Sequence, residues 1–301
     1  MLWQRCGATP ETLARALAAM SDDIAGLDIS GSSGLLGTTG IELLRPYLQR
    51  FTYLNLRNVP IQDVGLAALA NEPAAAHLDT LLVGGQITSD GLLALARSPH
   101  LRLRRLQILD AVASHDVWAT LLGSPVVAGL TTLLLARADI DESGIRTMGE
   151  NVRALESLVL DGSKLHRWGP LALATSPVMP QLVRLGLPRN RLDTDDITTL
   201  VDAHFPSLHT IDLSENCITE PAVLAIRDRR GMPTLARIVL ERETTIPTGS
   251  SVDYYDQGAL VSSGMTYHRP CSLKQRYFPN EPVDLVDQND LSWPDSSAEW
   301  L

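Results

Sequence analysis

The sequence predicts an α/β solenoid in which about nine coils of strand, turn and helix follow one another along the chain. Two observations carry this prediction. Apolar triplets with the spacing L-x-x-L-x-L recur, and their starts lie 27, 27, 25, 27, 25, 27, 26 and 27 residues apart. Each triplet is followed, after a turn, by apolar residues with the i, i+3 spacing of one buried helix face.

The triplets predict the strands. Side chains alternate along a strand, so the apolar residues face the core and the intervening residues face away from it. We number the six residues of each segment, so that positions 1, 4 and 6 are apolar. The nine triplets are Ile24/Leu27/Ile29, Phe51/Leu54/Leu56, Leu78/Leu81/Val83, Leu103/Leu106/Ile108, Leu130/Leu133/Leu135, Leu155/Leu158/Leu160, Leu182/Leu185/Leu187, Leu208/Ile211/Leu213 and Leu235/Ile238/Leu240.

The apolar residues with i, i+3 spacing predict the helices, as in Gly144-Ile145-Met148 and Asp196-Ile197-Leu200. Acidic residues stand at or just before the helix starts, at Asp63, Asp90, Asp116, Asp141, Asp195 and Glu220. A carboxylate there complements the helix dipole and caps free N–H groups, which contributes roughly 0.3–1 kcal/mol. This structural role accounts for the row of acids, so no metal site is predicted.

Two segments, "LVRLGLPRNRL" (182–192) and "LHTIDLSENCI" (208–218), match the longer pattern L-x-x-L-x-L-x-x-N-x-L, with Asn190 and Asn216 at the asparagine position. With this motif and the nearly constant period, residues 24–242 resemble the leucine-rich repeat family, in particular its ribonuclease-inhibitor-like branch. The resemblance implies a curved parallel sheet on the concave side and helices on the convex side. It also implies a role in recognition rather than catalysis, by analogy.

The segments outside the repeats are expected to cover the ends of the stack. Residues 1–23 are predicted to form an N-terminal helical cap, and 243–301 an aromatic, acidic C-terminal cap and tail. The glycine-rich stretch 27–44 has the strand–glycine–helix order of a phosphate-binding loop. It lacks the Lys-Ser/Thr of a P-loop, so we interpret it as the irregular turn of the first coil.

Composition excludes several classes of function. The net charge of −10 argues against a general nucleic-acid binder, and no apolar run approaches the roughly 18–20 residues that span a bilayer. Arg5, Glu11 and Arg15 interrupt any signal-peptide core, which favours a cytoplasmic protein. Only two of the 25 basic residues are lysines, and with the high alanine content this points to a GC-rich bacterial genome.

The three cysteines have no CxxC or CxxH spacing, so neither a disulfide framework nor a structural zinc is predicted, and no cofactor is expected. Cys217 is expected to pack inside as a small apolar residue. The alternative to a binding role is an enzyme or enzyme subunit that uses His268 with Cys271, since a reactive thiolate needs a neighbouring base. A structural oligomer joined through the end coils is a third possibility.

The concave sheet face is the predicted binding site, because its side chains are not needed for the core. Guanidinium groups spaced along a rigid sheet suit bidentate recognition of carboxylates. The predicted partner is therefore a protein or peptide with acidic segments, and the predicted role is non-catalytic binding. The candidate residues are Tyr53, Arg57, Arg105, Asp110, Arg137, Asp161, Arg184, Arg189, Asp212 and Arg237.

Overall fold

The computed structural model contains two compact units. Unit 1 comprises Met1–Lys164 with Ser176–Val178, and unit 2 comprises Leu165–Thr175 with Met179–Leu301. The predicted boundaries at residues 24 and 243 are not tested by this division and stay predictions. The structure describes residues 2–4, 10–30, 37–228, 231–240, 244–247, 265–268 and 284–287.

Unit 1 contains a parallel sheet whose strands pair in chain order. In every pairing from the second strand onward, position 4 of one triplet lies beside position 4 of the next, as in the series Leu27, Leu54, Leu81, Leu106, Leu133 and Leu158. The predicted register is therefore confirmed. The strands are β1 (Leu2–Gln4), β2 (Gly26–Asp28), β3 (Tyr53–Leu56), β4 (Thr80–Gly84), β5 (Arg105–Leu109), β6 (Thr132–Ala136) and β7 (Ser157–Asp161).

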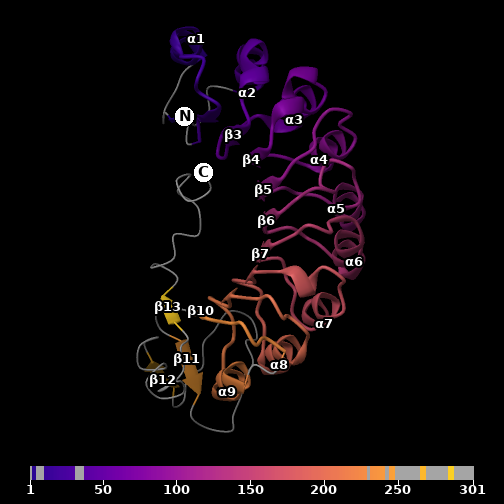
Figure 1. Ribbon diagram of the computed structural model, residues 1–301, viewed down its shortest axis with the longest axis vertical. Helices are drawn as coiled ribbons and strands as arrows, with labels where there is room; N and C mark the ends of the chain where they lie inside the picture. The colour runs from indigo at the N-terminus through magenta and orange to yellow at the C-terminus, as the bar shows by residue number, and fades with distance from the viewer. Residues whose placement is uncertain are drawn as a thin grey trace. The chain divides into compact units, whose positions relative to one another are not determined.

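One helix follows each strand from β2 to β6, and α3 to α6 lie along one side of strands β3 to β7 (Figure 1). Gly144 at the start of α6 is needed for this packing, because an added Cβ would lie 2.7 Å from Ile140 Cγ2. The helices are α1 (Pro10–Ala19), α2 (Gly37–Leu44), α3 (Gln62–Ala70), α4 (Ser89–Ala96), α5 (His115–Leu122) and α6 (Glu142–Asn151), with 3-10 helices at η1 (Arg45–Arg50) and η2 (Pro73–His77).

Unit 2 repeats the same coil with strands β8 (Arg184–Gly186), β9 (Thr210–Asp212) and β10 (Arg237–Leu240), which are parallel and paired in order. Its helices are α7 (Gly169–Ala174), α8 (Thr194–Asp202) and α9 (Glu220–Asp228), with the 3-10 helix η3 (Met179–Gln181). Among the described helices, none is long and apolar enough to cross a membrane.

The segment after β10 adds strands that the repeat pattern does not predict. β11 (Thr244–Pro247) and β12 (Met265–His268) form an antiparallel pair. β13 (Asp284–Asp287) pairs in parallel with β10, where Asp284 lies in register with Arg237. The run "DLVD" is too short to carry a periodic signal, which is why the sequence analysis missed it.

The core is mostly aliphatic, and its largest fully buried side chains are Trp118, Phe51 and Phe205. Position 4 of each triplet is at most 2% exposed in both units, and helix residues such as Ile145, Met148, Ile197 and Leu200 are equally buried. Burying one such side chain contributes roughly 1.5–3 kcal/mol, so the repeated apolar positions supply most of the stabilisation.

The asparagine position explains how neighbouring coils of unit 2 are joined. Asn216 Oδ1 accepts hydrogen bonds from the backbone N–H groups of Asn190 and Leu192, both at 3.0 Å. Asn216 Nδ2 donates to the carbonyl oxygen of Leu187 at 2.7 Å. The side chain thus satisfies backbone groups of the preceding coil that have left the strand ladder and would otherwise lack partners.

Candidate functional site

The sheet face opposite the helices, here called the open face, is built from positions 3 and 5 of the coils. Parallel pairing places residues of one position side by side, about 4.8 Å apart. We call the set at position 3 the position-3 row. In unit 1 it consists of Gly26, Tyr53, Thr80, Arg105, Thr132 and Ser157, and in unit 2 of Arg184, Thr210 and Arg237.

In unit 1 much of this row is buried. Tyr53 is only 5% exposed and Thr80 only 2%, so the expectation that Tyr53 faces solvent is wrong. Burial raises the pKa of Tyr53, and the negative charge of Asp28 raises it further. Arg105 is half-buried, and its Nε donates a 2.7 Å hydrogen bond to Thr80 Oγ1. The row in unit 1 is therefore largely engaged in packing and internal bonding.

In unit 2 the same row is open. Arg184 and Arg237 are exposed, with half-buried Thr210 between them in register. Neither arginine forms an ion pair with any residue that the structure describes. Asp212 at position 5 of β9 differs, because it is only 2% exposed and its Oδ1 accepts a 2.9 Å hydrogen bond from the backbone N–H of Ser214. The expectation that Asp212 faces solvent is therefore wrong.

In the described turns from Asn58 to Glu215, the residue two places after the triplet has a left-handed backbone. In four of these turns the residue is charged, which places charged side chains at one edge of the open face. Asp110, Arg137, Arg189 and Glu215 all have φ between 53° and 57°. Asp110 forms an ion pair with Arg137 of the next coil. Arg189 Nη1 lies 3.2 Å from Glu215 Oε1. Two of the predicted arginines therefore already have acidic partners within the chain.

The two remaining candidates lie at the ends of strands and also make internal contacts. The backbone N–H of Arg57 donates to Asn55 Oδ1 at 3.1 Å, and the Arg57 side chain is half-buried. The carbonyl oxygen of Asp161 accepts a 2.7 Å hydrogen bond from the backbone N–H of Arg137. These bonds hold the backbones of both residues at the ends of β3 and β7, and the role of their side chains stays a prediction.

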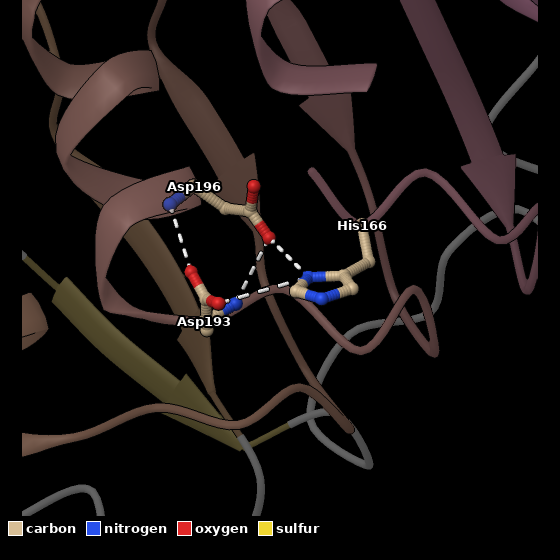
Figure 2. A group of neighbouring side chains, drawn as sticks. All are labelled: His166, Asp193 and Asp196. Atoms are coloured by element: carbon tan, nitrogen blue, oxygen red, sulfur yellow. Dashed lines mark hydrogen bonds and ion pairs between the residues drawn. The ribbon is translucent and has the colours of Figure 1, made fainter. Parts of the chain in front are cut away.

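A separate cluster that the sequence analysis missed lies at the start of α8 in unit 2 (Figure 2). His166 Nδ1 lies 2.8 Å from Asp196 Oδ2 and 3.8 Å from Asp193 Oδ2. Asp193 caps α8 by accepting hydrogen bonds from the backbone N–H groups of Asp195 and Asp196, both at 3.0 Å. Asp196 is 5% exposed and also accepts from the backbone N–H of Arg167 at 3.0 Å.

One nitrogen and two carboxylate oxygens in this cluster lie within 4.8 Å of one another, which is the spacing of possible metal ligands. The hydrogen bonds favour a different role. Arg167 Nε donates to His166 Nε2 at 3.1 Å, so Nε2 accepts and the proton of the neutral ring lies on Nδ1. A protonated Nδ1 donates to Asp196 and has no lone pair for a metal. The cluster therefore connects one coil to the helix start of the next.

The spacing of His166 and Asp193 in the sequence could have predicted this cluster. His166 and Asp193 are 27 residues apart and occupy the same position relative to their triplets, which is the position where other coils place the helix cap, as at Asp141. A polar residue at a cap position can reach the corresponding position of the neighbouring coil. Asp63, the second residue of α3 in unit 1, makes a related contact, because its Oδ1 accepts from the backbone N–H of Thr88, the N-cap of α4, at 2.8 Å.

The predicted reactive pair is only partly covered by the structure. His268 is the last residue of β12, where its backbone pairs with Thr244. Cys271 lies outside the described residues. Cys217 is exposed rather than packed inside, which corrects the sequence-based expectation. Its backbone N–H donates to the carbonyl oxygen of Leu192, and this bond holds the turn with the side chain outward.

No family model and no curated protein matches the chain. The leucine-rich repeat-containing protein LegL7 from Legionella pneumophila has a similar structure, with a TM-score of 0.52, 17% identity, and coverage of 79% of this chain and 82% of that chain. A chain of the yeast Rad7–Elc1 complex aligns with a TM-score of 0.39 and 15% identity over 94% of this chain and 89% of its own. Human trophoblast glycoprotein aligns with a TM-score of 0.42 and 17% identity over 64% and 70%.

Only the first of these likenesses supports an argument about the fold. It agrees with three features of the chain itself: the constant period, the parallel register of the triplets and the asparagine bonds between coils. The chain therefore has the leucine-rich-repeat fold.

Proposed function

We propose that this chain is a protein-binding module and that its open face receives a segment of a partner protein. The observation that carries the proposal is the position-3 row of unit 2, where Arg184 and Arg237 are exposed on a parallel sheet that the core holds rigid. The backbone that carries them needs no ordering on binding, so the conformational cost is confined to the two arginine side chains, about 0.5–1.5 kcal/mol each.

The charges on this face favour a partner segment with carboxylates. The chain as a whole has a net charge of −10, so two neighbouring arginines form a local region of positive charge on an otherwise acidic protein. Arginine binds carboxylates through two parallel hydrogen bonds, which supplies orientation as well as affinity. Complementary charge of this kind contributes mainly to specificity and to the rate of association.

In-cell photo-crosslinking tests this proposal. We place p-benzoylphenylalanine at Thr132 and Thr210 on the open face, and at Glu150 and Arg227 on the exposed sides of α6 and α9. A partner that uses the open face crosslinks from Thr132 or Thr210 and not from the helix positions. Crosslinks that come only from Glu150 or Arg227 would contradict the proposed face.

The enzyme and oligomer alternatives predict different products in the same experiment. A structural oligomer gives crosslinks between copies of this chain. A cysteine-based activity requires Cys271 to react rapidly with iodoacetamide near neutral pH, because a neighbouring base would increase its thiolate fraction. We expect Cys271 to alkylate at the rate of an ordinary thiol.

A further inference from the structure

The two arginines of unit 2 form a pair with a defined separation. Arg184 on β8 and Arg237 on β10 are in register with Thr210 on the strand between them. Their Cα atoms are thus separated by two strand spacings, or about 10 Å. Both side chains are exposed and form no ion pair with a residue whose side chain the structure describes, whereas Arg137 and Arg189 each have an acidic partner.

A segment of the same chain has the complementary charge. Residues 288–301, "QNDLSWPDSSAEWL", contain Asp290, Asp295 and Glu299 and no lysine or arginine. This segment, here called the acidic tail, follows β13 directly. Because β13 pairs in parallel with β10, the tail begins at the strand next to Arg237.

The acidic tail is long enough to cover both arginines. Its 14 residues span at most about 46 Å when extended. Arg184 lies three strand spacings from β13, about 14 Å across the sheet. The tail also carries Trp293 and Trp300, and an arginine guanidinium can stack on an indole ring. Tethering at β13 gives the tail an effective concentration in the millimolar range for a short linker.

We propose that the acidic tail docks across Arg184, Thr210 and Arg237 and competes there with the acidic segment of a partner. This inference rests on the proposed function, because it assigns a regulator to the same face. The tail acts as an internal ligand that a partner must displace. The apparent affinity for the partner is then the affinity of the open face multiplied by the fraction of time for which the tail is undocked.

A peptide-binding experiment with the full chain tests this. The probe is a fluorescein-labelled synthetic peptide with the sequence of residues 288–301, measured by fluorescence anisotropy at low salt. The host is a tail-neutral protein with Asp290→Asn, Asp295→Asn and Glu299→Gln, compared with the unmodified chain. We expect the peptide to bind the tail-neutral protein at least tenfold more tightly, because the unmodified tail occupies the site.

Two further variants show where the peptide binds. Adding Arg184→Ala and Arg237→Ala to the tail-neutral protein should weaken peptide binding at least tenfold. Adding Arg227→Ala, an exposed arginine on α9, should change it less than twofold. Equal binding to the tail-neutral and unmodified proteins, no binding to either, or binding that survives the arginine substitutions would each overturn the proposal.

The two proposals can fail separately. If the peptide experiment fails while a partner still crosslinks from Thr210, the tail is the wrong occupant and the binding face stands. If the peptide binds as expected while crosslinks come only from the helices, the tail docks as proposed and the partner uses another surface.

Discussion

The position-3 row has opposite characters in the two units, although one repeat pattern produces both. In unit 1, Tyr53, Thr80 and Ser157 are at most 5% exposed, and Arg105 is bonded to Thr80. In unit 2, the corresponding Arg184 and Arg237 are exposed and have no ion pair with a described residue. The repeat thus determines the direction in which a side chain points, while its neighbours in the row determine whether it is available.

This difference changes how much each candidate residue is expected to contribute to partner binding. From the sequence alone, Arg105, Arg137, Arg184 and Arg237 are equivalent, because each is an arginine on the predicted open face. An arginine that already has an acidic partner must break that contact before it can bind another carboxylate, so its net contribution to binding is small. The comparison can be tested at several levels, from the shared core to single pairs.

The largest expected effect concerns the register that both units share. Leu135 in β6 and Leu185 in β8 are 0% exposed, so Leu135→Asp and Leu185→Asp each bury an unpaired carboxylate. We expect each to lower the free energy of unfolding by more than about 4 kcal/mol. Half-buried Ala136 is the control, and Ala136→Asp should cost less than about 1 kcal/mol in urea unfolding. Equal losses of unfolding free energy for Ala136→Asp and Leu135→Asp would contradict the assigned strand register.

The carboxylates at the helix starts should also differ between the units in how much they contribute to stability. Asp196 in unit 2 accepts hydrogen bonds from His166 and from the backbone of Asp193 and Arg167, so Asp196→Ala should cost roughly 1.5–3 kcal/mol. Asp141 in unit 1 accepts one from Gly144 N–H, so Asp141→Ala should cost about 1 kcal/mol. Chemical denaturation measures both. A loss for Asp141→Ala as large as that for Asp196→Ala would contradict this assignment.

The histidine cluster also predicts the response to metal. Because the Nδ1 proton of His166 donates to Asp196, added Zn²⁺ should raise the Tm of the unmodified chain no more than that of His166→Ala. Thermal unfolding at equal metal concentrations makes the comparison. A rise in Tm that disappears with His166→Ala would show that the three side chains are metal ligands.

Binding should separate the engaged arginines from the available ones. With a partner identified by crosslinking, Arg184→Ala and Arg237→Ala should each weaken binding about tenfold, equal to about 1.4 kcal/mol. Arg137→Ala should weaken it less than threefold, because Arg137 is already paired with Asp110. Arg146→Ala on α6 is the helix-side control. Calorimetric titration measures the four proteins, and a tenfold loss for Arg137→Ala would show that its ion pair opens on binding.

The ion pair itself is expected to contribute little. Arg137 and Asp110 have side chains that are 71% and 43% exposed, so solvent screens their attraction. A double-mutant cycle with Asp110→Ala and Arg137→Ala should give a coupling of about 0.2–1 kcal/mol that falls with added salt. A coupling above this range that is insensitive to salt would mean that the pair is shielded from solvent.

The smallest effect near neutral pH concerns Tyr53. Burial raises its pKa in the folded chain above the usual value of 10.0, so the folded state holds the phenolic proton more tightly than the unfolded state does. This contribution to stability is complete below pH 10 and is lost as the pH rises through the raised pKa. Tyr53→Phe removes that alkaline loss. Unfolding free energies from pH 8 to 11 should therefore fall more for the unmodified chain than for the variant, and parallel curves would contradict the burial.

Local periodicity determined most of the fold. The triplets indicated the coils and the inward direction of residues such as Leu54 and Leu185, because a buried strand position must be apolar whatever lies elsewhere in the chain. The asparagine pattern likewise indicated Asn216, whose bonds join it to the preceding coil. The triplet recurs in all nine coils and the asparagine in two consecutive ones, so both can be read from one sequence.

Only the tertiary structure decided which of these residues are available. The burial of Tyr53 and Asp212 appears only in the folded chain. The pairing of Asp110 with Arg137 and the approach of His166 to Asp196 join residues of neighbouring coils. The pairing of β13 with β10 depends on a segment that lies more than 40 residues further along the chain. Such contacts follow from side-chain conformation and from the neighbours that the stacking supplies, which a period in the sequence does not specify.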